Sequence, residues 1–183
     1  FFDIKGDVEA LLAPRQARFV AFDHPAFHPG RCAQVWVGDV AVGVVGELHP
    51  KWRQAYDLPQ APVLFELDAQ VLAQRGVPAF TSVPKMQSVF RDLALVVTDT
   101  TSHDSVISAI TQAPTGGLVR GARLFDIYKP KAAVAGMAEN ERSLAVRIEL
   151  RDDEQTLNDE RIEQGIKQVI DAVAQSVGGR VRA

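Results

Sequence analysis

The sequence predicts an α+β protein built from two modules, and three observations support this prediction. Of the 183 residues, 46% are hydrophobic and 23% are charged, which is the composition of an ordinary globular protein. Short alternating apolar runs, which indicate β-strands, are interspersed with segments of helical periodicity. Gly76 and Pro78 interrupt this pattern, so we expect one module over residues 1–80 and a second over residues 84–183.

The first module is predicted to be a mostly antiparallel sheet with short flanking helices. Gly38 and Asp39 separate two apolar runs, residues 33–37 and 40–48, and predict a two-residue hairpin because glycine tolerates a positive φ. Pro50 favours a helix start, since the first turn does not use the N–H group that proline lacks. The other predicted elements are a helix at 7–13, a strand at 18–22, a loop at 23–31, a strand at 63–68 and a helix at 69–74.

The second module is predicted to follow the order β-α-β-β-α-β. Its elements are a strand at 91–97, a helix through Val106 and Ile110, strands at 118–128 and 143–150, a helix from Asn158 to Val177 and an edge strand at 180–182. In about 100 residues this order predicts the ferredoxin-like fold, in which four antiparallel strands carry both helices on one face.

One face of this predicted sheet has no helix over it. If the apolar residues that alternate along strands 91–97 and 143–150 face the helices, the open face receives Asp92, Ala94, Val96, Ala145, Arg147 and Glu149. Strand 118–128 adds either Leu124, Asp126 and Tyr128 or Arg123, Phe125 and Ile127, and the sequence leaves both registers open. Apolar side chains on an uncovered face indicate a partner, which can also be another domain of the same protein.

Charge is distributed unevenly along the chain. The formal net charge is −3, which gives no overall attraction for nucleic acid. Residues 118–131 nevertheless carry four basic side chains against the single acid Asp126, whereas residues 152–163 carry six acids against Arg161. The strand at 118–128 and the loop after it therefore form the local basic patch that an RNA partner would need.

The residues alone indicate no catalytic site and no metal site. His24 and His28 have a zinc-like spacing, but prolines place them in a loop and no third ligand stands close in sequence. Glu47 and His49 lack a neighbouring nucleophile, so we expect packing and capping roles. Cys32 is expected to be a small buried residue, and a single cysteine fits a reducing cytoplasm. No apolar run approaches the ~20 residues of a membrane helix, so no membrane partner is expected.

Stretches spread over nearly the whole chain carry a resemblance to a known family. Those of the second module are Val83-Pro-Lys-Met-Gln-Ser-Val-Phe-Arg-Asp-Leu-Ala-Leu95, Leu124-Phe-Asp-Ile-Tyr128, Ser143-Leu-Ala145 and Thr156-Leu-Asn158. Those of the first are Phe2-Asp-Ile-Lys-Gly6, Phe27-His-Pro-Gly-Arg31, Gly43-Val-Val-Gly-Glu-Leu-His-Pro50 and Phe65-Glu-Leu-Asp68. The second module resembles the ferredoxin-fold anticodon-binding domain at the C-terminus of the bacterial phenylalanine–tRNA ligase β subunit. The first looks like the end of that subunit's catalytic-like core domain.

The resemblance implies a piece of an α2β2 enzyme that joins phenylalanine to its tRNA with ATP. In that family the α subunit carries the chemistry, and the matching part of the β subunit has a class II synthetase-like fold without an active site. We therefore expect a cytoplasmic fragment that is inactive alone and holds no cofactor or metal, while the parent enzyme uses ATP and magnesium. The expected partners are the tRNA for phenylalanine, the α subunit and a second β subunit.

Taken together, residues and resemblance favour an RNA-binding and subunit-supporting fragment. Tyr128 would offer a stacking surface, and the expected contacts to phosphates or bases are Arg91, Arg123, Lys129, Lys131, Arg142 and Arg147. Strand parity points the Arg91 side chain toward the helices, so a buried or domain-bridging ion pair is an alternative to an RNA contact for this residue. Two other classes stay open: a pure scaffold whose open face packs on neighbouring domains, and a small-molecule regulatory domain. The lack of a glycine-rich loop after strand 91–97 argues against the latter.

Overall fold

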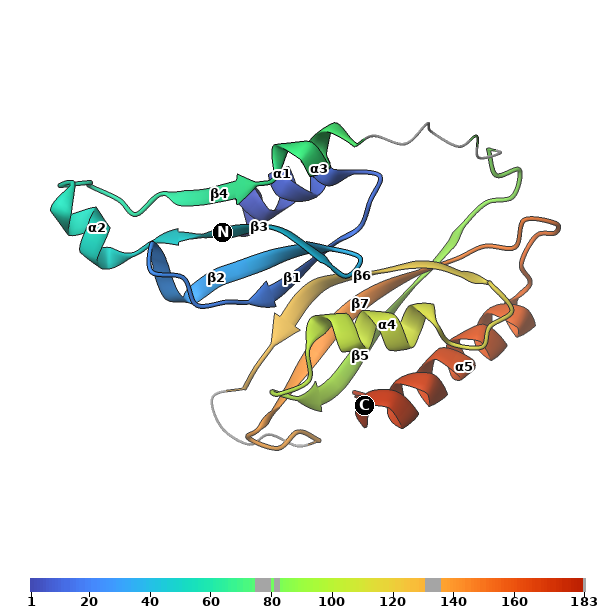
Figure 1. Cartoon of the computed structure of the whole chain (residues 1–183). Helices are drawn as coiled ribbons and strands as arrows, with labels where there is room; N and C mark the ends of the chain where they lie inside the picture. The colour runs from blue at the N-terminus through green and yellow to red at the C-terminus, as the bar shows by residue number, and fades with distance from the viewer. Residues whose placement is uncertain (75–79, 81–82, 131–135, 183) are drawn as a thin grey trace. The chain divides into compact units, whose positions relative to one another are not determined.

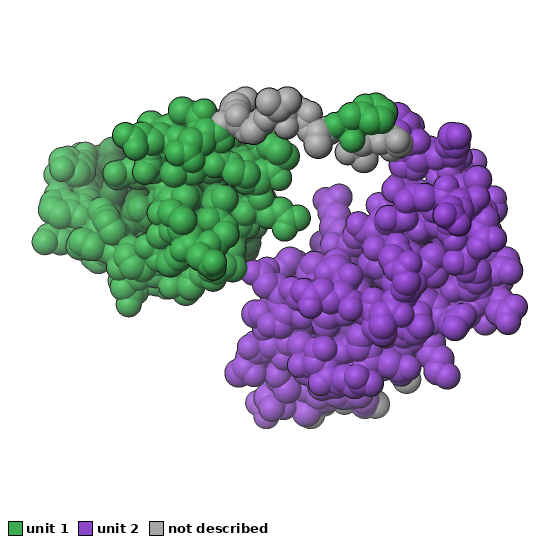
Figure 2. Space-filling view, turned by 45° about the vertical axis from the view of Figure 1, so that its right-hand side comes forward, with its two compact units in different colours: residues 1–80 green, residues 81–183 purple. Residues whose placement is uncertain are grey.

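The chain folds into two compact units. A computed structural model describes residues 1–74, 80, 83–130 and 136–182. Unit 1 comprises Phe1–Phe80 and unit 2 comprises Thr81–Ala183 (Figure 2). Each unit has its own four-stranded sheet and its own apolar core, and each is therefore described by itself.

Unit 1 is built on an antiparallel sheet in the order β1-β2-β3-β4 (Figure 1). Its elements are α1 (Phe2–Leu12), β1 (Ala17–Ala21), β2 (Phe27–Val37), β3 (Val40–Leu48), α2 (Pro50–Ala55), β4 (Val63–Leu67) and α3 (Ala69–Ala73). The predicted hairpin is confirmed, since Gly38 turns between β2 and β3 with a φ of +58°. Val8 and Leu12 of α1 pack with Val35 and Val45 of the sheet in one buried cluster.

Two predictions for unit 1 are wrong at their boundaries. The helix predicted at 7–13 begins at Phe2, because Ile4 packs against the same core as the later turns of α1. Part of the loop predicted at 23–31 belongs to β2, which begins at Phe27 and shifts register before Cys32. Phe27 is buried against Gly46, where a Cβ would lie 2.9 Å from the Phe27 Cγ. Tertiary packing thus extends the strand through a segment whose prolines predict a loop.

Unit 2 has the predicted βαββαβ order and the ferredoxin-like fold. Its elements are β5 (Val89–Thr98), α4 (His103–Thr111), β6 (Val119–Tyr128), β7 (Glu141–Leu150), α5 (Asp159–Val177) and β8 (Arg180–Val181). The antiparallel strands lie in the order β6-β7-β5-β8, and Figure 1 shows α4 and α5 on the same side of the sheet. The opposite face is therefore the one without helices.

The unit 2 core lies between that sheet and its two helices. Its buried members alternate along the strands, as predicted, and recur every three or four residues along the helices. They are Leu95, Val97, Leu144, Val146, Ile148 and Leu150 from the sheet, with Val106, Ile110, Val169 and Val173 from α4 and α5. α5 begins where Asn158 accepts a hydrogen bond from the Arg161 N–H at 2.9 Å, and it ends at Gly178 with a left-handed φ of 65°. Both ends of the longest helix were predictable from these two residues.

Candidate nucleic-acid interface

The open face of the unit 2 sheet is defined by strand pairing, because directly opposed residues of neighbouring strands point to the same side. Rows of side chains therefore cross this face from β6 through β7 to β5. The rows are Arg123–Arg147–Asp92, Asp126–Ala145–Ala94 and Tyr128–Ser143–Val96, and Arg180 of β8 extends the last one. The residues predicted to lie on the open side of β5 and β7 are confirmed there, since their neighbours along each strand belong to the core.

β6 follows neither of its two predicted registers along its whole length. Register shifts lie between positions 119 and 121 and between positions 124 and 126, and at the second shift β6 has one residue more than the facing stretch of β7. Arg123 before the second shift and Tyr128 after it consequently lie on the same open face. The extra residue, Phe125, also faces this side, because the Arg147 guanidinium lies over its ring. Each predicted register is therefore right for one half of the strand only.

Two aromatic rings on the open face each have a guanidinium above them. The Arg147 Cζ lies 5.5 Å from the centroid of the Phe125 ring, and the Arg182 Cζ lies 4.7 Å from the centroid of the Tyr128 ring. The two aromatic residues are still 53% and 42% exposed. Sequence reasoning did not single out Arg182, although parity along the short edge strand from Arg180 would have placed both arginines on this face.

Two arginines of the open face are held by carboxylates. Arg147 donates hydrogen bonds to both Asp92 oxygens, at 2.8 and 2.7 Å. Arg180 donates to both Glu141 oxygens, at 2.6 and 2.7 Å. The Arg147 hydrogen bonds keep the pKa of Asp92 below its usual value. Those from Arg180, with one from the Ala138 N–H, lower the pKa of Glu141 to about 2.

The predicted RNA contacts fall into different environments. Tyr128, Arg123 and Arg147 come together on the open face. The Lys129 Nζ, one residue beyond β6, lies 2.6 Å from the Asp99 Oδ2 in an exposed ion pair. Lys131 lies outside the described residues. Among the residues that the structure describes, Arg123 makes no ion pair, so its guanidinium is available to a ligand.

Arg91 and Arg142 lie on the other side of the sheet. Both pair with strand residues that belong to the helix-facing core. The Arg91 Nη1 donates to the backbone oxygen of Phe90 at 3.0 Å, and the Arg142 Nη2 donates to the backbone oxygen of Thr101 at 2.6 Å. The structure therefore does not bring these two arginines into the open-face group, and a role for them in RNA contact stays a prediction.

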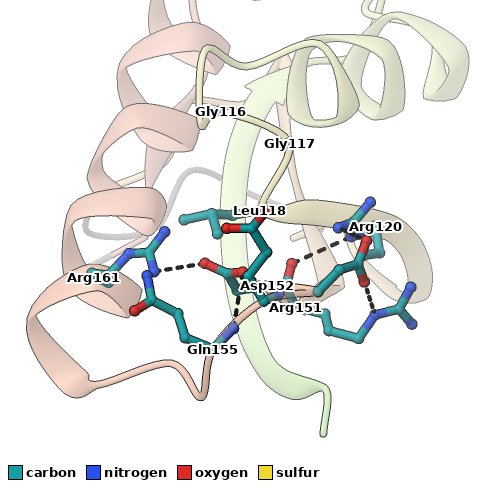
Figure 3. A pocket seen from close by; sticks show the side chains of 10 residues that line it. Gly116, Gly117, Leu118, Arg120, Arg151, Asp152, Gln155 and Arg161 are labelled. Carbon is teal, nitrogen blue, oxygen red and sulfur yellow. Dashed lines mark hydrogen bonds and ion pairs between the residues drawn. The ribbon is translucent and has the colours of Figure 1, made fainter. Parts of the chain in front are cut away.

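A second candidate is a polar hollow of about 410 Å³ at one end of unit 2 (Figure 3). Its charged lining consists of Arg120, Arg151, Arg161, Asp152, Asp153 and Glu154. Figure 3 shows Arg161 pointing toward Asp152, and each of the three arginines already has a carboxylate within 3.0 Å. The lining carries equal numbers of basic and acidic residues, so a charged small molecule would have to displace existing ion pairs. The ion pairs that line this hollow connect the start of β6 and the start of α5 to the segment that follows β7.

The candidate chemical groups of unit 1 have structural partners. His49 accepts from the Lys51 N–H at 3.0 Å and caps α2, as expected. The Glu47 carboxylate pairs with Arg31 at 2.7 Å, and this hydrogen bond lowers the pKa of Glu47. Cys32 is buried, and burial raises the pKa of its thiol, so the thiol is not activated as a nucleophile.

Metal-binding clusters and membrane-spanning helices are two further features that bear on function. Within the described part of the chain, no group of three or more histidine, cysteine, aspartate or glutamate residues is arranged to hold a metal ion. None of the described helices is long and apolar enough to cross a membrane.

Comparison with known proteins matches both units to one family. Residues 1–69 match the phenylalanyl tRNA synthetase beta chain CLM domain, and residues 84–182 match the ferredoxin-fold anticodon binding domain. The chain is 46% identical over its whole length to a phenylalanine–tRNA ligase beta subunit of Ralstonia nicotianae, 42% to that of Cupriavidus pinatubonensis and 46% to that of Chromobacterium violaceum. It spans 22–23% of the length of these relatives. The chain therefore belongs to the phenylalanine–tRNA ligase beta-subunit family, with residues 1–69 matching its CLM domain and residues 84–182 its ferredoxin-fold anticodon binding domain.

Proposed function

We propose that this chain is part of an enzyme that attaches phenylalanine to its tRNA with ATP, and that unit 2 binds the anticodon stem-loop of that tRNA. The observation that carries this proposal is the meeting of exposed rings and available guanidiniums on one sheet face without helices: Tyr128 and Phe125 with Arg123 and Arg182. The family description for residues 84–182, which names anticodon binding, supports the same role.

The physical case rests on what single-stranded RNA offers to a protein. Bases of a loop present flat faces that stack on aromatic rings, worth ~1–3 kcal/mol per base. Tyr128 and Phe125 lie on the same face and remain accessible for this contact. Arg182 lies over the Tyr128 ring and Arg123 lies on the same face of β6, so both would supply charge for phosphates or hydrogen bonds for base edges. Stacking and charge are therefore available within one continuous surface.

Unit 1 is proposed to support the assembly and to carry no chemistry of its own. Its candidate reactive groups are engaged in capping, an ion pair and burial. On the face of its sheet opposite the core, Val20 and Leu64 are exposed apolar side chains, and Phe22 directly after β1 is exposed as well. We propose that such surface meets the α subunit, a second β subunit or other parts of the β subunit in an α2β2 enzyme. ATP and magnesium would then act in the parent enzyme, with this fragment inactive alone.

A binding titration tests the RNA-binding part of the proposal. The 183-residue chain is titrated against a fluorescently labelled anticodon stem-loop of the tRNA for phenylalanine, at several salt concentrations. We expect binding at low ionic strength that weakens with salt, with log Kobs falling by about 0.7 per phosphate contact for each decade of salt. An equal-length RNA hairpin with a fully paired stem and a minimal loop serves as the control. Absence of salt-sensitive binding to the stem-loop would overturn the proposal.

A second candidate is a pure scaffold, favoured by apolar side chains that remain exposed on unit 2. Phe90 and Ile127 are 54% and 52% exposed, which is typical of surfaces that pack on other domains. Substituting Arg123 and Arg182 with Glu in the assembled enzyme separates the two functions. Weaker tRNA binding supports RNA contact with the open face, and unchanged affinity supports the scaffold.

A further inference from the structure

Building on the proposed RNA-binding role of the open face, we propose that Asp92 is a specificity-determining residue that withholds Arg147 from RNA phosphates. The face then meets RNA through its rings and through the available guanidiniums of Arg123 and Arg182, and not through a continuous positive surface. Asp92 thereby weakens binding to polyanions that offer phosphates but no unstacked bases.

The geometry of the Asp92–Arg147 contact carries this inference. The two residues are directly opposed on β5 and β7, on the face without helices. Nε and Nη2 of Arg147 each donate to a different Asp92 oxygen, at 2.8 and 2.7 Å. This is the two-point arrangement with which a guanidinium would otherwise grip a phosphate, so the carboxylate occupies the donors that RNA would use.

The position of Arg123 shows what Asp92 prevents. Arg123 is directly opposed to Arg147 on the other side, so the row across the sheet reads Arg123–Arg147–Asp92. Without the carboxylate, two guanidiniums would stand side by side on neighbouring strands. Like charges in that position repel each other and attract an anion between them. With Asp92 in place, the row carries one net positive charge instead of two.

Counterion release explains why this matters for specificity. A cationic side chain that neutralises a phosphate releases a condensed counterion, and this sequence-independent term dominates non-specific binding. A guanidinium that is already paired with a carboxylate adds little binding free energy when it contacts a phosphate, because the new ion pair replaces an existing one. Arg147 is therefore expected to add little to the salt dependence of binding, although it lies at the centre of the open face.

The salt dependence of binding to the anticodon stem-loop measures this directly. Four proteins are compared with the unaltered 183-residue chain: Asp92→Asn, Arg147→Gln, the double variant, and Asp171→Asn. Asp171 is an exposed acid on α5, which packs on the other face of the sheet, so its substitution changes net charge equally without touching the open face. Thermal unfolding verifies that each protein is folded at the binding temperature.

We expect the slope of log Kobs against log salt to be unchanged in Arg147→Gln and to steepen by about 0.7 in Asp92→Asn. At 0.1 M salt this steepening corresponds to about fivefold tighter binding, and the fully paired control hairpin should gain at least as much. The double variant should return to the slope of the unaltered chain, and Asp171→Asn should match it throughout.

Two results would overturn the inference while leaving the proposed function intact. One is a shallower slope by about 0.7 in Arg147→Gln, which would mean that Arg147 contacts a phosphate despite Asp92. The other is an Asp92→Asn slope equal to that of Asp171→Asn. If neither the unaltered chain nor Asp92→Asn binds the stem-loop, the proposed function and this inference both fall.

Discussion

Tyr128 and Arg182 come from opposite edges of the unit 2 sheet, and their side chains meet above its open face. β6 and β8 are the outermost strands, yet the Arg182 Cζ lies 4.7 Å from the centroid of the Tyr128 ring. Between them in the same row are Ser143 and Val96, which are 4% and 1% exposed although no helix covers that side. The Arg182 guanidinium occupies one face of the Tyr128 ring, so a base that stacks on Tyr128 must share or displace it.

Replacing Tyr128 by Ala should weaken binding to the anticodon stem-loop by about 5- to 150-fold, because one base loses its stacking surface. Tyr128→Phe should bind almost normally, since the ring stays. The chain offers one matched control, Tyr56→Ala, which removes the only other tyrosine, 67% exposed and in unit 1. Equal affinities of the two alanine variants in a fluorescence titration would show that Tyr128 does not stack on a base.

Arg182→Gln should make the salt dependence of RNA binding shallower by about 0.7, because an available guanidinium is lost. Arg182→Lys should keep the slope, since the charge remains. Lys167→Gln, on the exposed side of α5, is the control for net charge. A slope in Arg182→Gln that matches the control would remove Arg182 from the set of phosphate contacts.

Ile148→Ala should lower the free energy of unfolding by about 2–5 kcal/mol, because Ile148 is fully buried between the sheet and its helices. Ile127→Ala makes the same chemical change at a half-exposed position and should stay within about 1 kcal/mol of the unaltered chain. Urea unfolding followed by circular dichroism measures both. Similar losses in the two variants would contradict the assigned core.

Removing the Glu141 carboxylate should reduce the acid sensitivity of unit 2. The pKa of Glu141 is about 2 in the folded chain, below its ordinary value of 4.5, so its ionised form stabilises the fold fully above about pH 5. This contribution is lost as the pH falls through 2. Melting temperatures measured from pH 7 to pH 2 should therefore decline less steeply in Glu141→Gln than in the unaltered chain. If the melting temperatures of the two proteins declined in parallel with pH, the ion pair between Arg180 and Glu141 would not contribute to the acid sensitivity of folding.

Much of unit 2 could be predicted from the sequence because its signals are local. Alternating apolar residues indicate β5 and β7, and the α5 ends follow from Asn158 and Gly178. The order of these elements then leaves few possible topologies, so the ferredoxin-like arrangement and its open face follow. The family matches confirm the resemblance that the spaced motifs indicated.

The candidate surface was less predictable because it depends on contacts between distant residues. Strand parity breaks at the β6 bulge, and no residue type at positions 124–126 announces one extra residue. Arg147 and Asp92 are 55 positions apart in the sequence, so the sequence does not show that their charges neutralise each other on the folded sheet. Arg182 meets Tyr128 only after the whole sheet is assembled.

The bulge also defines where β6 tolerates a change of length. Phe125 is the unpaired residue, while the pairs on both sides of it are in register with β7. Deleting Phe125 would close the ladder and keep Tyr128 opposite Ser143, with one ring fewer on the surface. A deletion at this position in a related chain would therefore remove one ring from the face without turning the rest of the strand over. Related chains can therefore differ in the number of stacking rings on this face through a change of one residue in length.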